Sequence, residues 1–548
     1  MAHALAGKPV QEQDIIDVQT IVDAYFDNVP DMTNPTQLVS FGTSGHRGTS
    51  VDGTFTDLHV AAITQAICDG RKRFGATGPI FVGQDTHALS QPALVTVLEV
   101  LAGNGVTAMV DCDMDFVPTP SVSRAIIRYN EEHDDKADGI IITPSHNPPD
   151  NGGIKYNTII GGPADTVVTK WIEMRANEYL TAYCESEDFK RISIDNIEPT
   201  AQVPYDYKGL YVEELGDVIN MEAIKAAGPK VLVDTLGGSG ASYWNAIKER
   251  YGLDLTIIHD DYDPTFSFMT YDHDGKVRMD CSSTYVMASV INRIGDFDLA
   301  VGNDPDYDRY GIVVSSGLIS ANTFLTLAAR YLFTTRGWKN KGVGKTVVCT
   351  TMIDKWAADA GIPVFEVPVG FKYFSQLLFD GTIGIGGEES AGASFLKKDG
   401  TVWTTDKDGM IMALLSMEIM AVMGKSALKM ADESVEEFGN PSFGRIDAPC
   451  KKEQKQILKQ MSAELITATT VDGDPITNIR TTSLYNDMPI DGVRVETDKG
   501  WFVARPSGTE DLYKIYGESY KGDLGLVALL TAGEEIVNAA LNGTIETE

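Results

Sequence analysis

The stretch "GPIFVGQDTHALSQPALVTVLEVL", residues 78 to 101, decides the fold class of this sequence. It begins with a short apolar run, passes through a polar turn and ends in a helix-like pattern. The same plan recurs in "GPKVLVDTLGGSGASYWNAI" (228 to 247) and "GVGKTVVCTTMIDKWAADA" (342 to 360). Strands alternating with helices predict α/β units with largely buried sheets. The repeats lie roughly 150 and 115 residues apart, which is domain-sized, so we expect three α/β domains.

The joints between these domains are expected in turn-rich stretches. The chain has 548 residues, which is more than a single hydrophobic core accommodates. Candidate joints lie near residues 196–207, 317–323 and 438–445, and the segment after the last joint is smaller and less regular. We therefore expect domains at 1–205, 206–321, 322–440 and 441–548.

Composition narrows the class of protein. Hydrophobic residues make up 43% and charged residues 22% of the chain, as in soluble globular enzymes. The first twenty residues lack an apolar core, and the longest apolar stretch, Met410 to Met423, is interrupted by Ser416 and Glu418, so neither a signal peptide nor a membrane span is expected. Six scattered cysteines without a CxxC pair fit the reducing cytoplasm. The net charge of -33 repels nucleic acid and anionic lipid, so an anionic ligand needs a local cluster of cations.

A rigid loop follows a strand in "ADGIIITPSHNPPDNGGIKYN", residues 137 to 157. Its three prolines restrict φ and exclude a helix, while Gly152 and Gly153 permit close approach of the backbone. Loops at the carboxyl ends of strands are where α/β proteins bind ligands. Such rigidity suits a nucleophile, Ser145, that must be aimed, although a proline-rich surface turn would have the same composition.

Three aspartates follow a second strand in "FDLAVGNDPDYDRYGIVV", residues 297 to 314. Asp304, Asp306 and Asp308 offer hard oxygen ligands to one Mg²⁺. An EF-hand is excluded, because Arg309 and Ser315 occupy the positions that need Gly and Glu. A solvated acidic turn is the alternative.

Two further stretches could bind the ends of a sugar phosphate. In "IGIGGEESAGASF" (383 to 395), Glu388 and Ser390 could hydrogen-bond sugar hydroxyls, with Lys372 and Lys407 as nearby cations. In "WFVARPSGTEDLYKIY" (501 to 516), a phosphate clamp is expected from Arg505, Ser507, Gly508 and Thr509. Ordinary turns are the alternative reading of both.

Other motifs carry no function. "GVGKT" (342 to 346) lacks the first glycine of a Walker A loop, since position 339 is Lys, so ATP binding is not supported. "GIGGEE" likewise lacks the last glycine of GxGxxG. Of the eight histidines, His46 and His146 lie in glycine- or proline-rich loops, and the others are expected to be structural or on the surface.

Taken in order, these stretches resemble the α-D-phosphohexomutase superfamily, and within it the bacterial enzymes that act on glucose phosphates. The similarity runs from about Phe41 to the end, through "FGTSGHRG", "TPSHNPPDNGGIKYN", "NDPDYDR", "GGEESAGASF", "TDKDG" and "RPSGTE". The resemblance implies four domains around a central cleft, three of them α/β with mixed sheets and the last a TATA-binding-protein-like α+β domain. Pro144 replaces an alanine found in many relatives, and we expect little consequence.

The resemblance also implies roles for particular residues. Ser145 would carry the transferable phosphate, and Asp304, Asp306 and Asp308 would hold Mg²⁺ against it. Glu388 and Ser390 would read sugar hydroxyls, while Arg505, Ser507, Gly508 and Thr509 would bind the phosphate that is not transferred. The residues implied near the transferring phosphate are Arg47, His146 and Lys155, the last as proton acceptor or donor, with Arg309, Lys372 and Lys407 as further cations.

The implied reaction is reversible conversion of α-D-glucose 1-phosphate to glucose 6-phosphate through glucose 1,6-bisphosphate. The "GEESAG" stretch favours glucose, but a mannose-phosphate or dual-specificity enzyme is an alternative. A metal-dependent phosphatase and a catalytically silent sugar-phosphate sensor are the other rivals. We expect a cytoplasmic monomer or homodimer that binds hexose phosphates and neither nucleic acid nor membrane.

Overall fold

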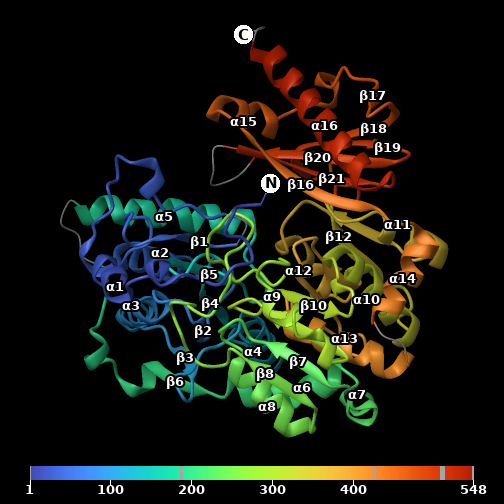
Figure 1. Ribbon diagram of the computed structural model, residues 1–548. Helices are drawn as coiled ribbons and strands as arrows, with labels where there is room; N and C mark the ends of the chain where they lie inside the picture. The colour runs from blue at the N-terminus through green and yellow to red at the C-terminus, as the bar shows by residue number, and fades with distance from the viewer. Residues whose placement is uncertain (1, 43, 185–188, 425–426, 507–511, 546–548) are drawn as a thin grey trace. The chain divides into compact units, whose positions relative to one another are not determined.

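A computed structural model describes residues 2–42, 44–184, 189–424, 427–506 and 512–545. The chain forms two compact units, whose helices and strands are labelled in Figure 1. The first unit comprises residues 1–321, 374–381 and 390–428, and the second comprises 322–373, 382–389 and 429–548.

The first unit opens with a six-stranded mixed sheet in the order β1-β5-β4-β2-β3-β6. Strands β4, β2, β3 and β6 run parallel to one another, whereas β5 is antiparallel to both β4 and β1. The strand bounds are β1 His46–Thr49, β2 Ile80–Gln84, β3 Ala108–Asp111, β4 Asp138–Ile142, β5 Asn151–Asn157 and β6 Gln202–Tyr205. The surrounding helices are α1 Val18–Asp27, α2 Asp57–Gly70, α3 Ser90–Gly103, α4 Thr119–Glu132 and α5 Thr166–Cys184.

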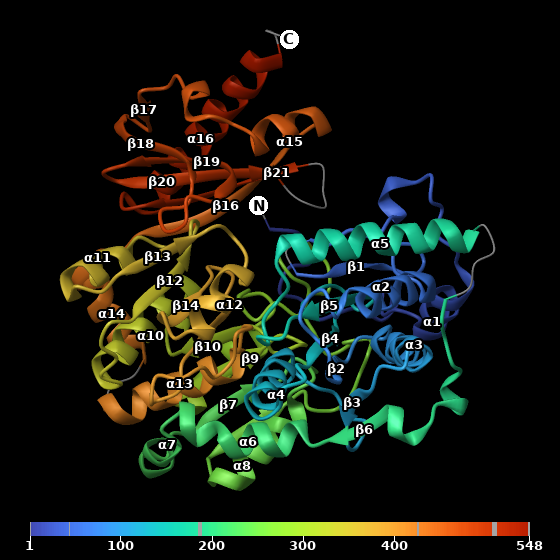
Figure 2. The ribbon, with the colours of Figure 1, turned by 180° about the vertical axis from the view of Figure 1, so that it is seen from behind.

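Helices cover both faces of this sheet (Figure 2). Because successive side chains of a strand point to opposite faces, Val82 and Ile140 pack into the core formed with α2, α3 and α5. Phe81 and Ile141 pack on the other face, with residues of α4. A sheet buried on both faces explains why β2 and β4 read as continuous apolar runs.

A second mixed sheet in the same unit has the order β11-β10-β9-β7-β8. Strands β8, β7 and β9 are parallel, and β9 and β10 form an antiparallel hairpin that leaves residues 304–309 between them. The strands are β7 Val231–Asp234, β8 Leu255–Ile258, β9 Leu299–Asn303, β10 Tyr310–Val314 and β11 Gly317–Leu318. The helices of this part are α6 Tyr207–Val218, α7 Met221–Ala227, α8 Ala241–Tyr251 and α9 Ala288–Ile291.

Later segments of the chain complete the first unit. They supply β15 Ala393–Phe395, most of α12 Lys372–Phe379, and α13 Gly409–Met423. Helix α13 is buried from Gly409 to Ile419 and packs against α7, β9 and β10. A helix that is apolar all round is expected in a core, so this apolar stretch of the sequence is a buried helix.

The second unit contains a parallel sheet in which β12 lies between β13 and β14. These strands are β12 Gly342–Thr346, β13 Val364–Val367 and β14 Ile383–Gly387, and the helices are α10 Ala321–Thr335, α11 Met352–Ala360 and α14 Ala427–Phe438. The "GVGKT" motif forms β12, with Lys345 buried in the strand. A strand is not a phosphate-binding loop, which agrees with the departure of this motif from Walker A.

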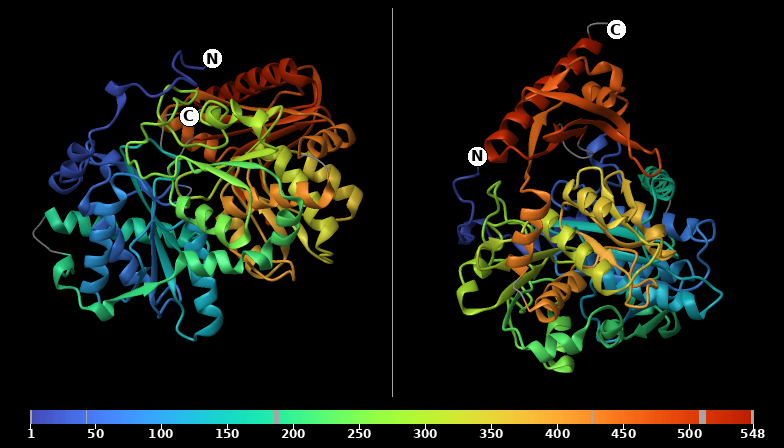
Figure 3. Two further views of the ribbon diagram at one scale, coloured as in Figure 1. Left: turned by 60° about the horizontal axis from the view of Figure 1, so that its bottom comes forward. Right: turned by 90° about the vertical axis from the view of Figure 1, so that its right-hand side faces the viewer.

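The C-terminal part of the second unit is an antiparallel sheet in the order β16-β21-β20-β19-β18-β17, with α15 and α16 packed on one face (Figure 3). The strands are β16 Ser442–Pro449, β17 Thr470–Val471, β18 Asp474–Thr482, β19 Pro489–Thr497, β20 Gly500–Pro506 and β21 Leu512–Ser519, and the helices are α15 Lys452–Lys459 and α16 Gly522–Ile545. Three mixed or parallel α/β sheets followed by an α+β part confirm the predicted fold class. Short 3-10 helices occur at Glu12–Asp14, Pro35–Gln37, Ile194–Asn196, Pro199–Ala201, Ile294–Asp296 and Ala463–Leu465.

Helix α16 contains an apolar segment that the sequence analysis overlooks. Among the described residues, Gly522–Asn542 is the one helical stretch long and apolar enough to cross a membrane by length and composition. The core helix of a globular domain meets the same criterion. Leu529, Leu530 and Val537 of this helix are buried in the core of the C-terminal sheet, whereas Leu524 and Val527 are exposed.

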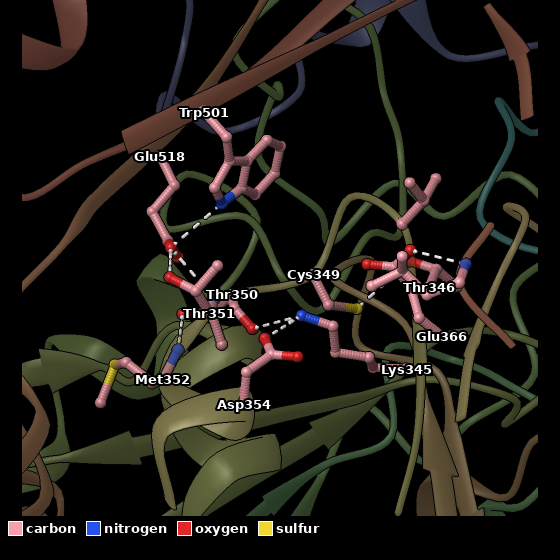
Figure 4. A network of polar contacts seen from close by, with 12 residues as sticks. Lys345, Thr346, Cys349, Thr350, Thr351, Met352, Asp354, Glu366, Trp501 and Glu518 are labelled. Carbon is pink, nitrogen blue, oxygen red and sulfur yellow. Dashed lines mark hydrogen bonds and ion pairs between the residues drawn. The ribbon is translucent and has the colours of Figure 1, made fainter. Parts of the chain in front are cut away.

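Within the second unit, buried polar contacts join the C-terminal sheet to the β12 layer (Figure 4). Trp501 Nε1 donates to Glu518 at 3.1 Å, and the backbone N–H of Thr351 donates to the same carboxylate at 3.0 Å. Arg494 donates to the carbonyl of Val347. Paired buried polar groups of this kind help to hold the two layers together within the unit.

Candidate active site

The loop after β4 holds Ser145 in a left-handed conformation. Its φ is 62°, and its backbone N–H donates to Thr143 Oγ1 at 2.7 Å. Gly153 of β5 lies against the loop so closely that a Cβ there would meet the Thr143 carbonyl oxygen at 2.2 Å. The glycine is therefore needed for the approach of β5. A left-handed residue in a proline-rich loop is a strained and over-determined position, which is common at reactive groups.

The Ser145 hydroxyl points to the metal-ligand candidates. Its Oγ donates to Asp304 Oδ2 at 2.9 Å and lies 3.2 Å from His146 Nδ1. Burial and the nearby Arg309 hold the pKa of His146 well below its usual value, so the imidazole is neutral. Its Nε2 lies 3.9 Å from Asp280.

The three aspartates lie together in the β9–β10 connection. Asp304, Asp306 and Asp308 are buried, and one carboxylate oxygen of each lies within 4.8 Å of the others. Within the described part of the chain, Asp306 Oδ1 and Asp308 Oδ1 have no hydrogen-bond partner although they are buried. Hard carboxylate oxygens with unused lone pairs are the ligands that Mg²⁺ binds, so these residues fit the ion.

Cations from distant segments surround the aspartates. Lys155 of β5 donates to Asp306 at 2.5 Å and to Asp308 at 3.1 Å. Lys407 Nζ lies 2.8 Å from Asp308 Oδ2, and Arg309 Nε lies 3.9 Å from Asp308 Oδ1. The site is therefore a mixed cluster of charges and not an acidic patch.

These charges shift one another's titration. Burial raises the pKa of Asp304, and its neighbours Asp306 and Asp308 raise it further. Burial also raises the pKa of Asp308, but Lys155 and Lys407 outweigh burial and hold it well below its usual value. Burial lowers the pKa of Lys155, but Asp306 and Asp308 outweigh burial, so Lys155 is an ammonium in this arrangement.

Arg47 lies in the same region, on β1. It faces Gly153 across the β1–β5 pairing and donates to Ser44 Oγ at 3.2 Å. Burial lowers its pKa, which the Asp306 and Asp308 carboxylates partly offset. The structure thus brings Ser145, His146, Arg47, Lys155, Arg309 and Lys407 around the three aspartates.

Several residues of this cluster escape sequence reasoning. Thr119 Oγ1 donates to Asp306 at 2.8 Å, and Arg309 lies 3.4 Å from Asp280. Asp406 accepts from Asn157 Nδ2 at 2.9 Å and precedes Lys407. The repeated acidic residues of "TDKDG" were a signal for Asp406, but nothing local distinguishes Thr119 or Asp280.

The remaining predicted site residues lie elsewhere. Ser390 lies in the first unit, next to Ala391, whose carbonyl accepts from the N–H of Tyr310. Three others belong to the second unit: Glu388, Lys372 and Arg505. Glu388 is buried at the end of β14, and Lys372 lies at the start of α12. Arg505 is in β20, and its Nε donates to the Ile490 carbonyl at 3.0 Å. Ser507, Gly508 and Thr509 lie outside the described residues. That these side chains share one substrate with Ser145 stays a prediction.

Comparison with known sequences matches four successive segments of the chain to domains of one family. Sequence models of the phosphoglucomutase/phosphomannomutase alpha/beta/alpha domains I, II and III match residues 38–182, 210–317 and 320–438, and the C-terminal domain of the same family matches 447–524. The chain is 47% identical over 539 residues to the phosphoglucomutase of Komagataeibacter xylinus, and 97% of each chain is covered. Phosphoglucomutase 1 of Saccharomyces cerevisiae is 27% identical over 526 residues, which covers 88% of each chain.

A solved structure shares the fold. The exocytosis-sensitive phosphoprotein pp63/parafusin of Paramecium matches with a TM-score of 0.72 at 20% identity, over 94% of this chain and 96% of that chain.

Proposed function

The chain belongs to the phosphoglucomutase/phosphomannomutase family of α-D-phosphohexomutases, and on this premise we propose which of its residues carry out the reaction. Its activity is that of a phosphoglucomutase, an isomerase that interconverts α-D-glucose 1-phosphate and glucose 6-phosphate. The observation that supports Ser145 as the reacting group is its hydroxyl, buried and 2.9 Å from Asp304 in a cluster of cations and carboxylates.

In the proposed reaction, phosphorylated Ser145 transfers its phosphoryl group to the free hydroxyl of the bound sugar phosphate. The bond from phosphorus to the serine oxygen breaks, and a bond from phosphorus to the sugar oxygen forms, which gives glucose 1,6-bisphosphate. The bisphosphate then turns end for end and returns its other phosphoryl group to Ser145. The enzyme finishes unchanged, with the phosphoryl group again on Ser145. Glucose 1,6-bisphosphate is the intermediate of this cycle and is also proposed as its activator.

The carboxylates of Asp304, Asp306 and Asp308, with Ser145, would hold Mg²⁺. Bound there, the ion supplies positive charge to the oxygens of the transferring phosphoryl group. Phosphoryl transfer depends on positioning and charge neutralisation. Arg47, Lys155, Arg309 and Lys407 provide fixed positive charge beside the same point, as the ion pairs of Lys155 and Lys407 with Asp308 indicate.

A proton must leave the attacking sugar hydroxyl and another must return to the serine oxygen. Lys155, an ammonium whose Nζ contacts Asp306 and Asp308, is the proposed donor of the proton that goes to the serine oxygen. Once it has given up that proton, it is the proposed acceptor of the proton from the attacking hydroxyl. His146, neutral and 3.2 Å from Ser145 Oγ, orients the hydroxyl. General acid–base groups need this hydrogen-bond proximity to the reacting atoms.

The far end of the substrate requires separate groups. We assign the sugar hydroxyls to Glu388 and Ser390, with Lys372 as a further cation. The idle phosphate is assigned to Arg505, Ser507, Gly508 and Thr509. Binding energy at a remote phosphate aligns the reacting hydroxyl. We further propose that the enzyme is cytoplasmic and is a monomer or a homodimer. Its domain boundaries are proposed near residues 205, 321 and 440, with the domains around a central cleft.

Substitution of the nucleophile tests the assignment. Ser145→Ala removes the hydroxyl that accepts the phosphoryl group, so turnover of glucose 1-phosphate should be abolished while the chain stays folded. Intact-protein and peptide mass spectrometry after incubation with glucose 1,6-bisphosphate should locate the phosphate on Ser145 in the parent enzyme. Mutase activity of the variant at the parent level would refute the role.

A second candidate activity follows from the family, which includes mannose-phosphate enzymes. Comparison of initial rates on glucose 1-phosphate and mannose 1-phosphate distinguishes the two. Slow release of inorganic phosphate from the phosphoenzyme would leave the mutase proposal intact, whereas release at the rate of turnover would favour a phosphatase.

A further inference from the structure

A buried pair of residues lies behind the serine loop. Asp85 follows β2 directly, and β2 runs parallel to β4, with Gln84 beside Ile142. The Asp85 N–H donates to the Ile142 carbonyl at 3.0 Å. The turn after β2 therefore lies against the start of the loop that carries Ser145, although the two are far apart in the sequence.

The Asp85 carboxylate accepts four hydrogen bonds. Oδ1 accepts from the His87 N–H at 3.0 Å and from Ser90 Oγ at 2.6 Å. Oδ2 accepts from Thr143 Oγ1 at 2.6 Å and faces His87 Nδ1 at 2.9 Å. All four side chains are at most 1% exposed. A carboxylate removed from water and bonded this fully has one orientation.

His87 faces an acceptor at each ring nitrogen. Nδ1 faces the Asp85 carboxylate, and Nε2 lies 3.0 Å from the carbonyl oxygen of Asn147. Neither partner has a proton to give, so both nitrogens must donate, and the ring is an imidazolium. Burial lowers the pKa of His87, but Asp85 outweighs burial and raises it, which agrees with this geometry.

The pair holds the serine loop on both sides of the nucleophile. Thr143, whose hydroxyl donates to Asp85, accepts the N–H of Ser145 on its other side at 2.7 Å. His87 binds the carbonyl of Asn147, two residues after Ser145. The left-handed φ of 62° at Ser145 is unfavourable for a residue with a Cβ, so external contacts must maintain it.

We propose that Asp85, His87 and Thr143 are positioning residues for phosphoryl transfer, which keep Ser145 Oγ aimed at Asp304. This inference rests on the function proposed above. In the hydrogen bonds of the described residues, none of the three contacts the carboxylates of Asp304, Asp306 or Asp308, so they act through the loop. The alternative is that the network only stabilises the fold.

A pair of substitutions at Thr143 separates these readings. Thr143→Val keeps the shape of the side chain and removes both hydrogen bonds. Because a small displacement of a reacting group can slow a reaction to this extent, kcat should fall by about 100-fold, while KM should change less than about twofold. Thr143→Ser keeps the hydroxyl and should stay within about threefold of the parent kcat.

Thr96→Val is the matched control for stability. Thr96 is fully buried in the same part of the first unit, and its hydroxyl donates to Asp57 at 2.6 Å, but it does not touch the serine loop. It should lower the melting temperature to a similar extent as Thr143→Val and leave kcat within about twofold. Equal loss of kcat in both valine variants, or an unchanged kcat in Thr143→Val, would overturn the proposal.

Substitution of His87 provides a second test, which decides the question if Thr143→Val does not fold. Glutamine retains a donor that can reach the Asn147 carbonyl but loses the simultaneous bond to Asp85, so His87→Gln should lower kcat by about tenfold with KM unchanged. The rate at which glucose 1,6-bisphosphate phosphorylates Ser145, followed by intact mass in a single turnover, should fall in parallel.

The outcomes distinguish this inference from the function on which it rests. A parent enzyme that neither turns over glucose 1-phosphate nor accepts a phosphoryl group on Ser145 would refute the proposed function, and the positioning role with it. A fully active parent whose His87→Gln and Thr143→Val variants match it would refute the positioning role alone.

Discussion

The ion pair between Arg480 of β18 and Glu366 of β13 gives a quantitative prediction about how the C-terminal sheet is held. Arg480 donates to Glu366 at 2.5 and 2.9 Å, and the two side chains are 9% and 2% exposed. Arg480→Met leaves the buried carboxylate without its main partner, which typically costs about 3–5 kcal/mol. Lys345 and Arg494 also lower the pKa of Glu366, so we expect the lower end, about 3 kcal/mol.

The same pair predicts a pH dependence. Burial raises the pKa of Glu366, but Arg480, Lys345 and Arg494 together outweigh burial and lower it overall. A lowered carboxyl pKa gives stability that is present above the unfolded value of about 4.3 and is lost as the pH falls through the folded pKa. In Arg480→Met the hydrogen-bonding cation is lost and burial is opposed only by Lys345 and Arg494, so Glu366 gains a proton more readily. The difference between the two proteins should therefore shrink below about pH 4.

Amide hydrogen exchange is the suitable assay, because a chain of several domains does not unfold in a single two-state transition. In peptides of β18 and β19, about 3 kcal/mol corresponds to exchange that is faster by roughly 100-fold. Arg445→Met is the control, because Arg445 and Asp447 form an ion pair in the same sheet with both side chains 39% exposed. Loss of this exposed pair should cost less than about 1 kcal/mol. Equal effects of the two substitutions, or a difference that does not change with pH, would refute the reasoning.

Two further predictions concern the substrate and the metal. Arg505→Ala should weaken the apparent affinity for glucose 1-phosphate by about 1.5–3 kcal/mol, which is the value of a charged hydrogen bond, and should change kcat little. Unaltered initial-rate kinetics would remove Arg505 from the site. Withdrawal of divalent cations with EDTA should stop turnover, and added Mg²⁺ should restore it. The reason is that the buried Oδ1 atoms of Asp306 and Asp308 fit such an ion. Activity that persists in EDTA would contradict the metal assignment.

The sequence predicts the proposed reacting groups because their chemistry lies in short stretches. The spacing of Asp304, Asp306 and Asp308 indicates a metal site, and the buried cluster is what that spacing predicts. The prolines and glycines around Ser145 indicate a rigid loop, and the structure gives Ser145 a left-handed φ. Local patterns of this kind need no knowledge of the tertiary fold.

The supporting groups cannot be found in this way, because the tertiary fold brings them together from distant segments. Thr119 reaches Asp306 from 187 residues away, and Thr143 reaches Asp85 from 58 residues away. His87 was expected to be structural or on the surface, and its contact with the Asn147 carbonyl depends on the placement of β2 beside β4. A useful signal was present nonetheless, since "GQDTHALS" occupies the turn of the first strand–turn–helix repeat.

That repeat accounts for the position of the three loops that carry predicted site residues. In each α/β part, the strand of the repeat lies parallel to the strand that ends in a predicted site: β2 beside β4, β7 beside β9, and β12 beside β14. Parallel neighbours end at the same edge of a sheet, so the turn of the repeat meets the functional loop there. The three repeats thus predict where support for each loop must come from.

The contacts follow this rule in all three cases. After β2, Asp85 binds Thr143 of the serine loop. After β7, the Ser239 hydroxyl donates to the Pro305 carbonyl of the metal loop at 2.8 Å. At the end of β12, the Thr346 hydroxyl donates to Glu389, beside Glu388, at 3.1 Å. One architectural unit, used three times, therefore supports the three loops that we propose to carry the nucleophile, the metal ligands and the sugar-binding residues.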